Sequence, residues 1–246
     1  MTRPEQQAMP LCRLLEAQGA STLRLPAIDI KACGAPGEAR ARIGALDAFA
    51  VIIFTSANAV RFGHSLLERR GDLTLAAIGP ATARALSECG YDVSLRPRQG
   101  FTSEALLADP ALEDLTTRRI LLIKGADGRP LLQQELARRG ADVVAIDVYQ
   151  RIAATPSALD LAAVQTQFTA GRLQVVTATS LDVGKRLLEV VPPELRLQLQ
   201  RAHWLVPGER VAKALREHGL DAPLLQASSA EDHDLVRALL RWRSSP

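Results

Sequence analysis

The stretch VIIFTSAN at residues 51–58 decides the fold, because the chain repeats it as VVTATSLD at residues 175–182. The two Thr-Ser pairs are separated by 124 positions (179 − 55). In each copy, the short run of β-branched and apolar residues predicts a strand that is buried on both faces. The Thr, Ser, Asn and Asp residues that follow are typical of a helix start. The sequence therefore predicts a strand–turn–helix unit that occurs twice.

Two further segments recur. Residues 79–90 match residues 208–219 at a constant spacing of 129 (208 − 79), and residues 15–20 match residues 136–141 at a spacing of 121 (136 − 15). Each copy contains a helix that ends at a glycine. Strands that alternate with helices in this way predict the α/β class, with parallel sheets covered by helices.

The order of the repeats permits two domain divisions. One division cuts the chain near residue 115, and the other inserts a middle domain into a discontinuous one. The similar strands Ala27–Ile30 and Ala145–Val148 favour the insertion, since they could pair as a hinge. We therefore expect two similar flavodoxin-like or Rossmann-like parallel-sheet domains joined by a two-stranded linker, with the active-site cleft between them. The predicted bounds are residues 1–27 plus 153–246 for domain 1, 33–145 for domain 2, and 28–32 and 146–152 for the linker.

Domain 1 is expected to have a missing or truncated first strand. The strand Ile120–Ile123 precedes the second copy of the third repeat, whereas only Met1–Pro4 and the residues after it precede the first copy. Either the chain as given starts a few residues late, or one sheet has lost a strand that its counterpart keeps.

Composition excludes several functional classes. No apolar run approaches the ~20 residues that span a bilayer, and the start of the chain lacks a signal peptide, so a cytoplasmic protein is expected. Cys12, Cys33 and Cys89 are too widely spaced to indicate a disulfide framework or a zinc cluster. The formal charge of +3 is not clustered and the aromatic content is 4%, which argues against nucleic-acid binding.

The known catalytic and cofactor motifs are missing. The turn GADG at residues 125–128 follows a predicted strand, but it fits neither GxGxxG nor GxxxxGK, so dinucleotide and nucleoside-triphosphate binding lose their support. The histidines do not form HExxH, and no serine lies in GxSxG. The run Asp232-His233-Asp234 is interpreted as surface charge favoured by a helix dipole. Metal and hydrolase chemistry are not expected.

Helix starts at the carboxyl ends of parallel strands offer backbone N–H groups to anions. The repeated segments at residues 55–58, 79–82, 125–130, 179–180 and 207–210 are starts of this kind. Each of them singly is better explained as ordinary capping, and Thr179 with Asp182 and Ser228 with Glu231 have capping-box spacing. Their expected convergence at one crevice favours carboxylate or phosphate binding.

Tyr149 is one of only two tyrosines and is expected to follow the connecting strand immediately. A phenol at that position could donate a hydrogen bond to a departing hydroxyl. It could equally be an amphipathic packing residue with its hydroxyl in water.

Five motifs together resemble the uroporphyrinogen-III synthase family. They are FTSANAV at residues 54–60, AIGPATA at 77–83, GFTSEAL at 100–106, Lys124-Gly125 through Arg129, and Val148-Tyr149. The resemblance covers nearly the whole chain. It implies a monomeric, cofactor-free, two-domain lyase of haem biosynthesis that cyclises hydroxymethylbilane to uroporphyrinogen III with inversion of ring D. The linear substrate would be handed over by the preceding enzyme.

The resemblance also implies a role for particular residues. Tyr149 would be catalytic, and the substrate-binding candidates are Thr55, Ser56, Asn58, Gly79, Thr82, Lys124, Gly125, Arg129, Thr179, Ser180, Gly208 and Arg210. The chain departs from the family at residues 207–210, where PGER replaces a glycine turn with a threonine, so Arg210 is expected to substitute for a hydroxyl contact. A non-catalytic two-lobed protein that binds an acidic small molecule is the rival interpretation.

Overall fold

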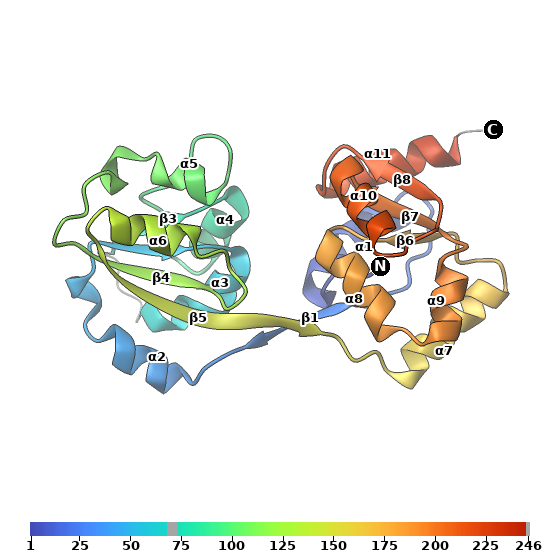
Figure 1. Ribbon diagram of the computed structural model, residues 1–246, viewed down its shortest axis with the longest axis horizontal. Helices are drawn as coiled ribbons and strands as arrows, with labels where there is room; N and C mark the ends of the chain where they lie inside the picture. Colours follow the sequence, from blue (N-terminus) through green and yellow to red (C-terminus); the bar gives the residue numbers. More distant parts are fainter. Residues whose placement is uncertain (68–72, 245–246) are drawn as a thin grey trace. The chain divides into compact units, whose positions relative to one another are not determined.

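The structure is a computed structural model that describes residues 1–67 and 73–244 (Figure 1). The chain folds into two compact units, Met1–Asp29 with Ile152–Pro246, and Ile30–Arg151. We call them the terminal unit and the middle unit. Both are built from parallel strands and helices, as the α/β pattern predicts. Among the described residues, no helix has the length and apolar character needed to cross a bilayer.

The sheet of the middle unit has five strands in the order β1-β5-β4-β2-β3. β2 pairs in parallel with β3 and β4, and β4 pairs in parallel with β5. The strand bounds are β1 Ile28–Ala32, β2 Val51–Phe54, β3 Leu75–Ala77, β4 Arg119–Gly125 and β5 Asp142–Ala153. All four residues of β2 are buried, as expected for a strand covered on both faces.

Alternate residues of β2 pack against different helices. Ile52 and Phe54 join a core with α2, α3 and α4, whereas Val51 and Ile53 join a core with α5 and α6. The helices are α2 Pro36–Ile43, α3 Ala57–Gly63, α4 Pro80–Glu88, α5 Ser103–Leu107 and α6 Leu131–Arg138, with short 3-10 turns at Leu46–Ala48, His64–Leu67 and Pro110–Leu112. The sheet is therefore covered on both faces, and the carboxyl ends of its strands remain free to carry a site.

The terminal unit repeats this plan around the parallel strands β6-β7-β8, which span Val175–Thr177, His203–Pro207 and Leu224–Ala227. Trp204 and Val206 of β7 face a core with α7, α8, α9 and α10, and Leu205 faces α1 and α11. The helices are α1 Glu5–Glu16, α7 Ala158–Thr169, α8 Leu181–Val190, α9 Pro193–Leu199, α10 Glu209–Glu217 and α11 Asp232–Arg243.

Met1 and Thr2 lie beside β6. Thr2 N–H donates to Thr177 Oγ1 at 3.3 Å, and the Thr2 hydroxyl donates to the Thr177 carbonyl. On the other side, the N–H groups of Leu25 and Ala27 donate to the carbonyls of Met1 and Thr2 at 2.8 and 3.0 Å. Met1 and Thr2 therefore lie beside β6 as the strand residues Ile120–Ile123 lie beside β2 in the middle unit. In the terminal unit, these two residues stand where the sequence predicted a missing or truncated first strand.

The connecting strand is longer than the sequence predicted. β5 runs through twelve residues, Asp142–Ala153, whereas the expected strand ended at Val148. Tyr149 therefore lies inside a strand and does not follow one. β1 pairs with the later part of β5, because Cys33 N–H donates to Val148 O and Ala154 N–H donates to Ala27 O, so the two strands run in opposite directions.

Candidate functional site

A pocket of about 280 Å³ opens at the carboxyl ends of β2 and β4 in the middle unit. Six predicted site residues line it: Thr55, Ser56, Lys124, Gly125, Arg129 and Tyr149. Its wall also includes Phe101, Thr102, Ser103, Asp127 and Arg151. Small-molecule sites enclose roughly 300–1,000 Å³, so this pocket is sized for part of a large ligand.

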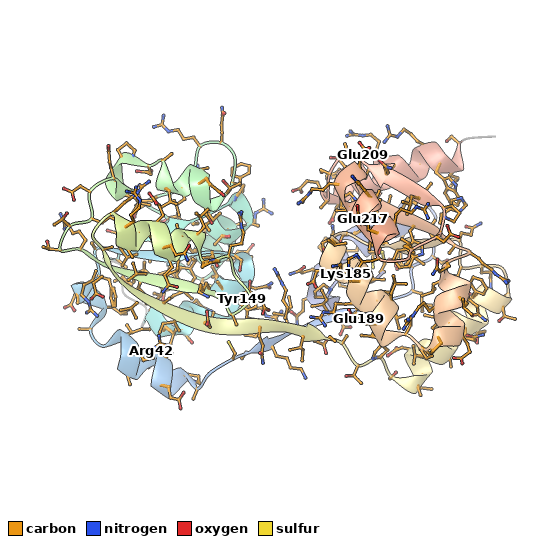
Figure 2. All side chains as sticks on the ribbon, in the orientation of Figure 1. Arg42, Tyr149, Lys185, Glu189, Glu209 and Glu217 are labelled. Atoms are coloured by element: carbon orange, nitrogen blue, oxygen red, sulfur yellow. The ribbon has the colours of Figure 1, made fainter. Side chains whose placement is uncertain are left out.

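Tyr149 lies on β5 and lines the pocket (Figure 2). The side chain is buried, its ring stacks on Phe62 with centroids 6.0 Å apart, and its Oη lies 3.1 Å from Ser56 Oγ. Ser56 Oγ also accepts from Ala59 N–H at 3.0 Å. Because Ser56 can donate its own hydrogen to Tyr149, the phenol hydrogen is available to a ligand.

Gly125 makes room for that phenol. A Cβ at this position would lie 2.6 Å from Tyr149 Cζ and 2.9 Å from Tyr149 Oη. The β4–β5 register shifts at the same place, where Gly125 pairs with Tyr149 after Lys124 pairs with Asp147. This irregularity in the strand pairing directs the Tyr149 side chain across the end of β4.

Two of the predicted anion-binding serines are helix caps. Ser56 caps α3, and Ser180 caps α8 by accepting from Val183 N–H at 3.2 Å. Thr179 and Asp182 have capping-box spacing but do not form a capping box, because the N-cap residue of α8 is Ser180, one position later. Ser228 and Glu231 do not form the predicted capping box, because Glu231 is itself the N-cap residue of α11 and, within the described part of the chain, no side chain caps that helix. In the turn before it, Ser229 accepts from Glu231 N–H and donates to Asp234 Oδ2.

The two predicted cations of the pocket, Lys124 and Arg129, are paired with carboxylates. Lys124 Nζ lies 2.6 Å from Asp147 Oδ1, and the lysine side chain is only 13% exposed. Arg129 is 70% exposed and lies 3.4 Å from Glu104. Hydrogen bonds from the Glu104 backbone and from Thr102 hold the pKa of the Glu104 carboxyl below its usual range. Arg129 is free enough to swing toward an anionic ligand, whereas Lys124 is fixed.

The predicted residues of the terminal unit follow β6 and β7. Thr179 is buried and accepts from Arg3 Nε at 3.1 Å. Gly208 has φ +82° and precedes Glu209, the first residue of α10 (Figure 2), so its conformation favours glycine. Arg210 lies exposed in the first turn of that helix.

Three predicted residues of the middle unit lie outside the pocket lining. Asn58 is in the first turn of α3, Gly79 caps α4 with an extended backbone, and Thr82 is buried within α4. A second hollow lies along β5 and is lined by Arg42, Lys124, Gln133, Val143, Val144, Ala145 and Asp147. It holds one predicted residue, Lys124, so the pocket at Tyr149 is the better candidate.

Sequence reasoning missed Phe101 and Arg3. Phe101 was quoted in the motif GFTSEAL but given no role, although it is 55% exposed at the pocket with φ +27°. Arg3 forms an ion pair with Asp232, whose side chain is 24% exposed. Asp232 lies in the first turn of α11, as predicted, but it also has a partner in Arg3 that the sequence did not indicate. No local pattern in the sequence indicates the partner of Arg3, because Thr179 lies 176 positions away.

Comparisons with known proteins agree on one family. A family model for uroporphyrinogen-III synthase HemD matches residues 10–237. A uroporphyrinogen-III synthase of Salmonella typhimurium is 32% identical over 251 residues, which cover 97% of this chain and 98% of that protein. The enzyme of that name from Escherichia coli is 29% identical over 250 residues, with 97% and 98% covered.

Solved structures show the same fold. The uroporphyrinogen-III synthetase of Helicobacter pylori aligns with a TM-score of 0.61 and 16% identity, covering 89% of this chain and 92% of that one. A mutant uroporphyrinogen III synthase of Thermus thermophilus aligns with a TM-score of 0.57 and 23% identity, covering 97% and 94%.

Proposed function

The chain belongs to the uroporphyrinogen-III synthase family, and we propose that it cyclises hydroxymethylbilane to uroporphyrinogen III as a hydro-lyase that inverts ring D. The observation that supports this role best is the pocket in which Tyr149 Oη meets Ser56 Oγ at 3.1 Å beside the carboxyl ends of β2 and β4. This pocket combines the phenol hydroxyl of Tyr149 with several groups that can bind anions.

The first chemical step is loss of the bilane hydroxyl. Tyr149 donates a hydrogen bond to that oxygen, which takes up a proton and leaves as water, and the pyrrole N–H of the same ring gives up one proton in balance. Ser56 donates to Tyr149 and stabilises its oxygen. The ring that carried the hydroxyl becomes an electrophilic azafulvene. Because the leaving group is labile, a phenol suffices as donor, and a stronger acid is not required.

Orientation decides the product. The substituted carbon of ring D attacks the azafulvene to give a spiro-pyrrolenine, which fragments and closes again at the other carbon. The same linear substrate closes without an enzyme to the uninverted isomer, so the protein must hold ring D in the reactive geometry. We propose that carboxylates of the substrate bind the helix starts after β2, β4, β6 and β7, including those at Ser56, Ser180 and Gly208.

Both compact units contribute groups in this proposal. The middle unit provides the phenol and the cations Lys124 and Arg129, and the terminal unit provides Thr179 and Arg210. The pocket of about 280 Å³ accommodates only part of a tetrapyrrole.

The deciding experiment resolves the product isomers. Purified protein is mixed with bilane generated by the preceding enzyme, and the products are oxidised to porphyrins and separated by chromatography. We expect the type III isomer to predominate. Only the type I isomer, at the rate of the protein-free control, would reject the enzymatic role and support the rival of a non-catalytic binding protein.

A further inference from the structure

Arg3 links three segments that are distant in sequence. Its Nε donates to Thr179 Oγ1 at 3.1 Å, one terminal nitrogen pairs with Asp232, and the other donates to the Ala230 carbonyl at 2.7 Å. The guanidinium side chain is only 13% exposed. These contacts join the residue after Thr2 to the turn after β6 and to the start of α11.

The contact with Thr179 fixes how that hydroxyl can be used. Arginine has no acceptor, so Thr179 Oγ1 must be the acceptor in this hydrogen bond. Within residues 1–67 and 73–244, the Thr179 hydroxyl hydrogen has no acceptor of its own. The hydroxyl hydrogen is therefore not used by this contact and can be donated to another oxygen, and the hydrogen bond from Arg3 strengthens the hydroxyl as a donor.

The internal repeat supports the same conclusion. The spacing of 121 that relates residues 15–20 to residues 136–141 places Arg3 opposite Lys124, which lines the pocket of the middle unit. Both cations are 13% exposed and each is paired with a carboxylate, Asp232 or Asp147. The chain thus holds a fixed cation at the corresponding place in each unit.

We propose that Arg3 is a positioning residue that presents the Thr179 hydroxyl to a carboxylate of the substrate. Arg3 acts through Thr179 and does not itself grip the substrate, because Asp232 already neutralises its charge. The inference rests on the proposed function, since it concerns the binding of the same acidic tetrapyrrole.

The test is a double-mutant cycle between Arg3→Lys and Thr179→Val, with steady-state KM and kcat measured on enzymatically generated bilane. Lysine keeps the charge beside Asp232 but lacks the Nε donor, so the fold is expected to remain intact. Thr179→Val should raise KM about tenfold, the size expected for a lost hydrogen bond to a charged group. Arg3→Lys should raise KM several-fold with kcat nearly unchanged, and the double variant should match Thr179→Val.

A control separates positioning from general stability. Arg24→Gln removes an exposed ion pair with Glu5 in the same unit and should leave KM and kcat unchanged. An unchanged KM in Arg3→Lys, or a KM increase in the double variant equal to the product of the two single increases, would overturn the inference. A parent protein that forms no type III isomer would instead refute the proposed function.

Discussion

We expect the Tyr149 hydroxyl to contribute more to the reaction rate than to the stability of the fold. Tyr149→Phe removes only Oη, and Ser56 Oγ keeps its hydrogen bond from Ala59 N–H. We predict that kcat falls on the order of 10²-fold, the lower end for a general-acid role. Steady-state rates in the coupled bilane assay measure this change.

The other tyrosine provides the matched control. Tyr91 is also buried in the middle unit, but it lies outside the pocket lining. Tyr91→Phe makes the same chemical change and should leave kcat within about twofold. Equal rates for Tyr149→Phe and the parent would remove Tyr149 from the mechanism.

Gly125 is predicted to be intolerant of any side chain. In Gly125→Ala, the new Cβ must displace the Tyr149 ring, since it would lie 2.6 Å from Cζ. We expect a loss of ~1–3 kcal/mol in the free energy of unfolding, typical of an overpacked core, together with a reduced kcat. Chemical denaturation and the isomer assay measure the two effects.

Gly37→Ala is the control for that substitution. Gly37 lies in α2, and a Cβ there meets no atom within 4 Å. Alanine is the better helix former, so stability should rise by up to ~1 kcal/mol with activity unchanged. A Gly125→Ala protein as stable and active as this control would show that the phenol tolerates displacement.

The residues of the site were predictable to different degrees. Thr55 and Ser56 could be placed at a strand end because their segment occurs twice. The contact between Arg3 and Thr179 could not, because it joins residues 176 positions apart and depends on how α1 enters the unit. Sequence patterns report local periodicity, whereas side-chain partners across a fold depend on its packing.

At the scale of elements, α6 carries a carboxylate that should make stability depend on pH. Hydrogen bonds from Arg138 and then from Arg139 lower the pKa of Glu135 to about 2 from an ordinary value of 4.5. A carboxyl with a depressed folded-state pKa contributes stability above pH 4.5 and loses it as the pH falls toward 2. Arg139 also donates to the carbonyls of Leu107 and Leu112, so the contact joins α6 to the segment after α5.

We therefore predict that Glu135→Gln lowers Tm by about 2 °C at pH 7 and by less at pH 3. The difference shrinks because at pH 3 the unfolded parent chain protonates Glu135 while the folded protein keeps it largely ionised, so acid favours the unfolded state of the parent. Thermal melts followed by circular dichroism at both pH values measure it. Glu189→Gln, which removes an exposed pair with Arg186 in α8, should change Tm less at pH 7. A constant difference at both pH values would contradict the assignment.

Element types followed from the sequence better than element lengths did. The apolar runs at residues 51–53 and 120–123 became β2 and β4, because both are buried on each face. β5 exceeded its prediction because its later half pairs with β1, an interaction between residues more than a hundred positions apart. The register shift opposite Gly125 has no signal in the sequence, since it arises from the pairing itself.

At the scale of the whole molecule, each compact unit has its own cores. The two clusters centred on β2 and β4 contain only residues of the middle unit. The two clusters around β7 contain only residues of the terminal unit. Hydrophobic burial is the main stabilising term in folding, so each unit carries its own source of stability.

The tryptophans make this separation measurable, because Trp204 and Trp242 both belong to the terminal unit. Tryptophan fluorescence should therefore follow the unfolding of that unit alone, whereas far-ultraviolet circular dichroism follows both. We predict that Leu121→Ala, which truncates a fully buried residue of β4, lowers the stability of the middle unit by ~2–5 kcal/mol and shifts part of the dichroism transition without moving the fluorescence transition. Leu215→Ala, at an equally buried site in α10, should shift the fluorescence transition instead. If Leu121→Ala moved the dichroism and fluorescence transitions together, the two units would unfold as one cooperative structure. The stability of each unit would then not depend on its own cores alone.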